Sequence, residues 1–97
     1  MKKITQQSVQ KFLDGIPFKK ENMEVVREGS IYYLKLFGNK IAAKRGSELW
    51  ISNAGWFTKT TKERLNALPN VKINQRDWNW YLNGKVWDGK PIYIGNI

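Results

Sequence analysis

The sequence predicts an α+β fold from three observations: two segments with helical spacing, a block of alternating residues broken by glycine turns, and an Asn-Gly hairpin signal. We expect an N-terminal helix over residues 5–14, a three-stranded antiparallel meander over 30–52 and a central helix over 60–68. Two or three C-terminal β-hairpin strands should follow residue 70. Ninety-seven residues with 41% hydrophobic content suit a single domain, residues 1–97.

The N-terminal helix is predicted from apolar residues that recur at helical spacing: Val9, Phe12, Leu13 and Ile16. Thr5 is its expected N-cap, and Gly15 and Pro17 should end it. Residues 18–22, FKKEN, are charged and lack a period, so they are expected to form a loop. Residues 23–27 are a candidate for the first strand.

The meander is predicted from three runs with a period of two, SIYYLKLF, KIAAKR and ELWIS. A two-residue turn at Gly38 and Asn39 would place Tyr33 opposite Lys44. This register sorts the side chains into two faces. One face is apolar and should cover the core: Tyr32, Leu34, Leu36, Ile41 and Ala43. The other interleaves aromatic residues with lysines: Tyr33, Lys35, Phe37, Lys40, Ala42 and Lys44.

The central helix has a complete start and stop signal. Thr60 is its expected N-cap, Glu63 would close a capping box, and Pro69 cannot continue the helix. Leu65 and Leu68 mark the side that should be buried.

The C-terminal hairpin is predicted from Asn-Gly, the strongest short hairpin signal. Its register places Trp80 opposite Trp87, and we expect this pair to pack against the central helix. Trp78 and Leu82 should share the face of Trp80. A small domain without disulfides needs large side chains in its core, so we expect three or four of the five tryptophans to be buried there: Trp50, Trp56, Trp78, Trp80 and Trp87.

The residue inventory excludes several kinds of chemistry. The chain has no cysteine and no histidine, which excludes disulfides, Cys/His zinc sites and imidazole-based catalysis. Turns and a helix cap account for several carboxylates. We therefore expect no enzyme, no catalytic residue, no metal and no cofactor. No secretory signal or membrane-length apolar run is visible, so a cytoplasmic protein without membrane contact is expected.

The charge predicts a polyanionic partner. Seventeen Lys and Arg against eight Asp and Glu leave a formal charge of +9. Two candidate sites follow. Stacking of exposed bases is predicted on the face of the meander formed by Tyr33, Lys35, Phe37, Lys40 and Lys44. Phosphate binding is predicted at the start of the central helix, at Lys59, Thr60 and Lys62. The alternatives are rings that only cover lysine stems, an ordinary capped surface helix, and a charge that serves solubility alone.

Three motifs, FGNKIA, GWFTKTTKERLNALPNVKI and WYLNGKVWDGKPIYI, make the region of about residues 34–94 resemble a family of short bacteriophage-encoded proteins. The resemblance implies a phage origin, and with it the cytoplasm of the infected host. The resemblance assigns no catalytic or binding role to any residue.

Two functions are compatible with these features. The first is non-catalytic binding of nucleic acid, DNA or RNA, largely through phosphate contacts. The alternative is a phage inhibitor that binds an acidic surface of a host protein. A homodimer is also compatible, because pairing across a two-fold axis would protect an open sheet edge.

Overall fold

The computed structural model describes residues 2–97, and its elements are mostly strands, which account for 44% of these residues against 20% in helices. The elements are α1 (Lys3–Asp14), β1 (Phe18–Lys20), β2 (Met23–Glu28), β3 (Ile31–Leu36), β4 (Asn39–Arg45), β5 (Glu48–Ile51), α2 (Lys59–Leu65), β6 (Ile73–Arg76), β7 (Asn79–Leu82), β8 (Lys85–Trp87) and β9 (Ile92–Asn96).

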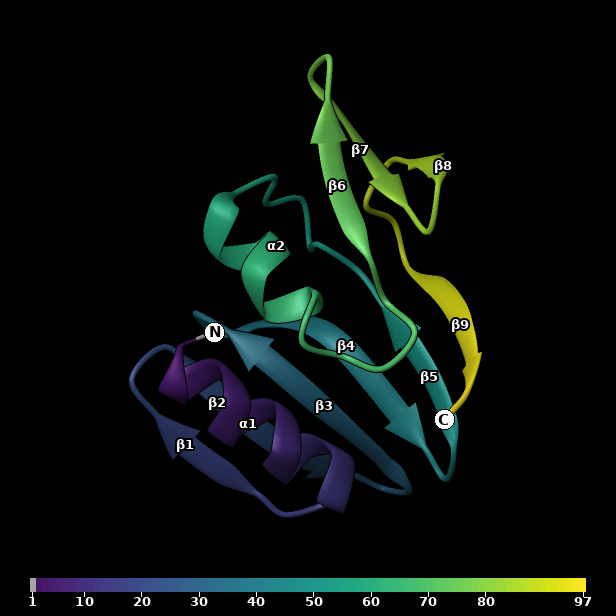
Figure 1. Cartoon of the computed structure of the whole chain (residues 1–97). Helices are drawn as coiled ribbons and strands as arrows, with labels where there is room; N and C mark the ends of the chain where they lie inside the picture. Colours follow the sequence, from purple (N-terminus) through teal and green to yellow (C-terminus); the bar gives the residue numbers. More distant parts are fainter. Residues whose placement is uncertain (1) are drawn as a thin grey trace.

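The strands form two antiparallel sheets (Figure 1). The larger has the order β1-β2-β3-β4-β5-β9, and the smaller has the order β6-β7-β8. The predicted α+β arrangement of a three-stranded meander and a central helix is therefore wrong, since the meander is part of a six-stranded sheet and strands predominate. Two strands explain the error. β1 is short and charged, and β9 pairs with a strand about 40 residues earlier, which no local pattern reveals.

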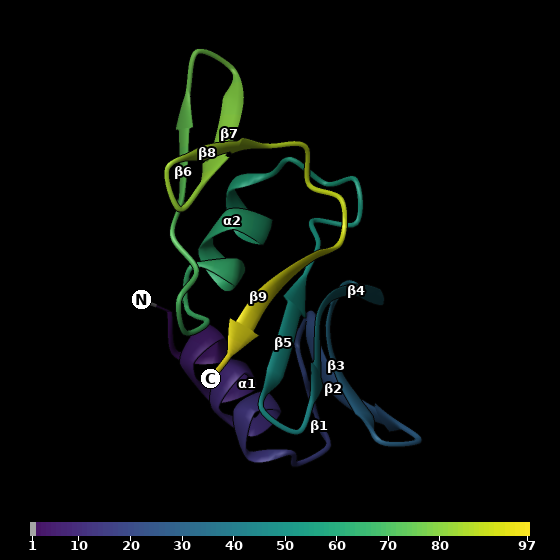
Figure 2. The same cartoon turned by 90° about the vertical axis from the view of Figure 1, so that its right-hand side faces the viewer.

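One face of the large sheet is covered and the other is open. Both helices lie on the same side of this sheet, and the three-stranded sheet lies beyond α2 (Figure 2). A single buried cluster joins the helices and both sheets: Ile4, Val9, Phe12, Met23, Val25, Leu34, Leu36, Ile41, Ala42, Leu49, Ile51, Leu65, Leu68, Val71, Ile73, Trp80, Leu82 and Trp87. We call the uncovered side the outer face.

The turn between β3 and β4 differs from the predicted one. It consists of Phe37 and Gly38, with φ of 50° and 80°, and Asn39 already belongs to β4. Two successive residues with positive φ form the turn whose twist matches that of the flanking strands. Glycine supplies the second of these positions without steric cost. The turn therefore begins one residue earlier than expected.

A β-bulge in β4 also changes the register. Lys35 pairs with Lys40, but Leu34 pairs with Ala42, so Ile41 is the extra residue. Because the bulge turns Ile41 and Ala42 to the same side, both are buried. The predicted register, and the assignment of Ala42 to the exposed face, are therefore wrong.

The N-terminal helix begins earlier than predicted, and Thr5 does not cap it. The helix starts at Lys3, and the Lys2 side chain makes no capping hydrogen bond. Thr5 is buried, because its hydroxyl accepts a hydrogen bond from Arg64 Nη1 at 2.7 Å and donates to the Glu63 carboxylate at 2.7 Å. These bonds join α1 to α2, a contact between segments far apart in the sequence.

The central helix is also displaced toward the N-terminus. Thr58 is its N-cap, and the Thr58 hydroxyl accepts a hydrogen bond from the amide of Thr61 at 3.1 Å. The predicted cap at Thr60, and with it the capping box through Glu63, is wrong. Thr58 carries the same hydroxyl group as Thr60, but it precedes the helix. It therefore caps the free amides of the first turn from a position two residues earlier in the chain than predicted.

The C-terminal hairpin is confirmed in its register, and Trp80 lies opposite Trp87 with ring centroids 6.2 Å apart. Both belong to the buried cluster that contains two leucines from α2 and the turn after it. The expectation of three or four buried tryptophans is wrong. Trp50 is half-buried, whereas Trp56 and Trp78 are exposed because they lie in loops rather than on a covered face.

Candidate nucleic-acid interface

The outer face of the large sheet brings together three of the predicted site residues. Tyr33, Lys35 and Lys40 lie there, and Lys40 Nζ is 3.9 Å from the centroid of the Tyr33 ring. Lys44 lies on the opposite face, where it pairs with Tyr32 and its Nζ is 5.9 Å from that ring. The bulge separates Lys44 from the other lysines of the prediction.

Charges on the outer face are largely offset, with three carboxylates against four cations. Lys40 forms an ion pair with Glu28 at 3.2 Å, and Arg45 forms one with Glu48 at 3.0 Å. The other two cations of this face, Lys19 and Lys35, are both cross-strand neighbours of Glu24. Each cation therefore has an acidic neighbour. A polyanion on this face would have to displace carboxylates, which weakens electrostatic binding there.

The outer face also carries exposed aromatic surface. The rings of Trp50 and Tyr93 have centroids 5.1 Å apart, on the neighbouring strands β5 and β9. Together with Tyr33 and Pro91, Trp50 borders a shallow apolar hollow. This surface suits contact with flat apolar groups, but it adds no net charge.

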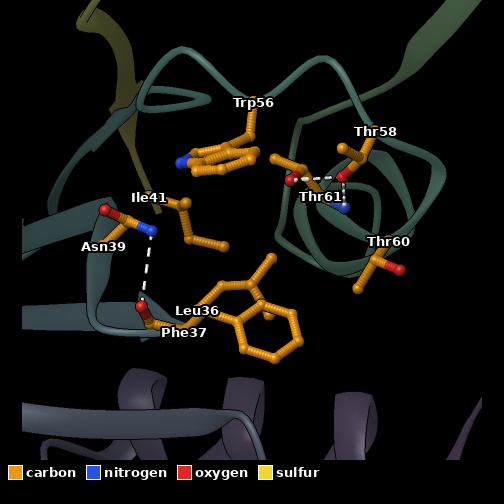
Figure 3. A pocket seen from close by; sticks show the side chains of 8 residues that line it. All are labelled: Leu36, Phe37, Asn39, Ile41, Trp56, Thr58, Thr60 and Thr61. Carbon is orange, nitrogen blue, oxygen red and sulfur yellow. Dashed lines mark hydrogen bonds between the residues drawn. The ribbon is translucent and has the colours of Figure 1, made fainter.

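Phe37 and Thr60 lie together at a different place, an apolar pocket of about 250 Å³ between the β3–β4 turn and the start of α2. Figure 3 shows the Trp56 indole on one side of it and the Phe37 ring on the other. These two side chains are 56% and 70% exposed. The pocket is lined by Leu36, Phe37, Asn39, Ile41, Trp56, Thr58, Thr60 and Thr61. We call it the aromatic slot.

Uncompensated positive charge is concentrated in two segments: residues 2–22, with a net charge of +3, and α2 with the three-stranded sheet, residues 59–90, which we call the basic module. Its seven Lys and Arg residues against three Asp and Glu leave a net charge of +4 on a third of the chain. Six of these cations are at least partly exposed: Lys59, Lys62, Lys72, Arg76, Lys85 and Lys90. Lys62 Nζ donates to Gln75 Oε1 at 3.0 Å, which links α2 to β6.

The seventh cation of the basic module, Arg64, belongs to the interior. It is buried and bonded to Glu63, Thr5 and, at 3.3 Å through Nη2, to Asn22 Oδ1. Burial alone would raise the pKa of the Glu63 carboxyl. Hydrogen bonds from Thr5 and Arg64 and the charge of Arg64 outweigh that effect, so the pKa of Glu63 is lowered. Buried Arg64 and the partly exposed Glu63 therefore neutralise each other where α1 meets α2.

Sequence reasoning missed Trp56, Arg76 and Trp78 as candidate surface residues. Arg76 lies on β6 with its Cζ 5.1 Å from the ring of Tyr81, so a cation and an aromatic ring are stacked on the three-stranded sheet. The signal for Trp78 was present, since Asp77 before it favours a turn. A tryptophan in a turn is not held in a strand face.

Within residues 2–97, no helix is long and apolar enough to cross a membrane. The same residues contain no group of three Asp or Glu side chains placed to hold a metal ion.

The fold and these surfaces define a small, strand-rich protein in which a helix-covered antiparallel sheet carries a basic module with exposed aromatic residues. The chain belongs to the Kyanoviridae Gp96 protein family, whose model matches residues 1–97. It is thus a phage protein, and the phage origin implied by the resemblance is confirmed. Comparison with curated proteins and with solved structures found no match.

Proposed function

We propose that this protein binds nucleic acid without catalysis, mainly through contacts between phosphates and the basic module. The observation that carries the proposal is that the basic module combines net positive charge with exposed aromatic surface, namely Trp78 and the stacked pair of Arg76 and Tyr81. On the outer face three carboxylates offset four cations, whereas the basic module has a net charge of +4. Lys59 and Lys62, two residues selected from the sequence, lie on this module, and Thr60 lies between them on α2.

The number of free cations sets the expected salt dependence. Lys90 lies 3.9 Å from Asp88, which leaves five exposed or half-exposed cations on the module for phosphate contact. If all five contact phosphates, the slope of log K against log[salt] should be about −3.5 on single strands and about −4.5 on duplex. A shallower slope would mean that fewer of them contact the backbone.

The proposal is tested by fluorescence anisotropy with labelled single- and double-stranded DNA and RNA across a range of salt concentrations. The double variant Lys72→Ala/Arg76→Ala should reduce the steepness of the slope by about 1.4 on single strands and about 1.8 on duplex. The matched control, Lys3→Ala/Lys19→Ala, removes the same charge from α1 and β1, and it should change the slope by less than half as much. Equal effects of the two variants would contradict a module-based interface, and absence of binding at low salt would eliminate the function.

Tyr33→Ala provides a test of the other predicted location. If bases stack on the outer face, this variant weakens binding, and the interface must be moved to that face. If the basic module holds the ligand, the affinity of Tyr33→Ala stays within about twofold of the parent.

The alternative partner is an acidic surface of a host protein, since the basic module would attract it by the same charge. Affinity capture from host lysate with nuclease present separates the two. A single host protein retained after nuclease treatment, together with no binding to purified oligonucleotides, would replace the nucleic-acid proposal.

A further inference from the structure

The hairpin between β6 and β7 carries an unusual tip. Trp78 is 93% exposed and lies in the two-residue turn that it forms with Asp77. This hairpin projects from the top of the molecule in Figure 1, away from the large sheet. A tryptophan in this position contributes almost nothing to the buried cluster.

Trp78 also has an unfavourable backbone conformation. Its φ is +70° and that of Asp77 is +52°, the combination found in type I′ hairpin turns. The second position of such a turn favours glycine, because a Cβ is strained at positive φ, and for a bulky residue this conformation is rare. Here the strain is not offset by burial. Strained residues that bring no folding benefit are frequent at functional sites.

The side chains beside Trp78 indicate which partner the tip suits. Gln75, Arg76 and Asn79 are exposed around it, and Arg76 stacks on the ring of Tyr81 in the same sheet. Guanidinium and amide groups are the donors that contact phosphates and base edges. An aromatic ring between such donors is typical of surfaces on which unpaired bases stack. The polar surroundings do not suit an apolar docking surface.

We propose that Trp78 stacks on a nucleobase that has lost a stacking neighbour, while the basic module holds the adjacent phosphates. This proposal rests on the proposed function, and it specifies which part of the nucleic acid the hairpin tip contacts. Such a base occurs in a single strand, or in a duplex at a step opened by an inserted side chain. In both cases the flat face of the base is the group recognised.

The test compares three variants with the parent by anisotropy, on a labelled twelve-nucleotide oligothymidylate and on a labelled twelve-base-pair duplex. Trp78→Gly should weaken binding by about 5- to 150-fold, the range for loss of one stacked base. Its salt slope should stay that of the parent, because no phosphate contact is removed. Trp78→Phe keeps a stacking ring and should remain within a few-fold of the parent. Val86→Ala, which removes another exposed apolar side chain from the same sheet, should have no effect.

Loss of affinity on the oligothymidylate identifies an unpaired base as the ligand, and loss on the duplex alone identifies an opened step. A Trp78→Gly protein that binds both probes as the parent does would overturn this inference and leave the proposed function standing. A parent that binds neither probe at low salt would remove both. Trp78→Gly should melt no lower than the parent, since glycine accepts positive φ, so weaker binding cannot be attributed to unfolding.

Discussion

Replacing Trp80 by alanine should remove most of the stability of this domain. Trp80 is 2% exposed and lies on β7, with its side chain against the loop before α2. The Phe57 ring packs edge-on against it, with centroids 5.1 Å apart, and Trp87 lies 6.2 Å away on the partner strand. Alanine would leave both rings facing a cavity.

The magnitude follows from the buried area. A buried tryptophan removes about 200 Å² from water, and about 25 cal/mol per Å² gives about 5 kcal/mol. Alanine retains part of that burial, and measured replacements of large aromatic residues cost about 3–5 kcal/mol. A domain of this length has a total free energy of unfolding of about 5–15 kcal/mol. We therefore expect a loss of about 3–5 kcal/mol and a melting temperature lower by at least about 12 °C.

Urea unfolding followed by circular dichroism measures this loss. Trp80→Phe is the informative second variant, because the buried Nε1 has no hydrogen-bond partner within residues 2–97 and phenylalanine removes that polar group. It should cost less than half as much as Trp80→Ala. Trp78→Gly is the control, because it removes an indole ring that is not buried and should leave the unfolding midpoint unchanged or higher. A Trp80→Ala protein that unfolds at the same urea concentration as the parent would show that the core has been assigned to the wrong aromatic residues.

Three further outcomes test particular contacts. Gly89→Ala should destabilise the fold by about 2–4 kcal/mol, because the added Cβ would lie 2.2 Å from the buried Asn53 amide. The control Gly84→Ala has nearly the same φ but open space around it, so it should cost only about 1–2 kcal/mol. Equal costs for the two variants would refute the close contact. Thr58→Ala should cost about 1 kcal/mol in urea unfolding and Thr60→Ala much less, the reverse of what the sequence predicts. Because the pKa of Glu63 is lowered in the folded state, its carboxylate stabilises the fold at pH values above the ordinary pKa of 4.5, and this contribution is lost as the pH falls through the lower folded-state pKa. Glu63→Gln should therefore lose less stability than the parent between pH 6 and pH 3. A pH profile of stability that is the same for both proteins would contradict this.

Local signals in the sequence were sufficient where the structure depends on neighbours along the chain. Asn83 and Gly84 determine a tight turn, and that turn alone places Trp80 opposite Trp87. The N-cap of α2 was misplaced by only two residues, because Thr58 and Thr60 have the same capping chemistry.

The errors concern contacts between distant segments. Nothing near Thr5 indicates that it will be buried by Arg64, a residue 59 positions away. The bulge at Ile41 depends on which side chains the core can accept, and it moved Lys44 off the predicted lysine face. The offset of cations by carboxylates on the outer face could be found only after the strands from β1 to β5 had been aligned. Composition predicts a basic protein, but it does not predict which surface carries the charge.

The pairing of β9 with β5 has a consequence for the order of folding. The two strands are hydrogen-bonded neighbours, yet about 40 residues, including the whole basic module, lie between them. Closing a loop of that length costs about 2.6 kcal/mol more entropy than closing a two-residue hairpin. The strands from β1 to β5 pair through short turns and should form first, and β9 should join last and open most readily. Amide hydrogen exchange should therefore be faster in β9 than in β3, so that one end of the module is held by the most easily released strand of the sheet.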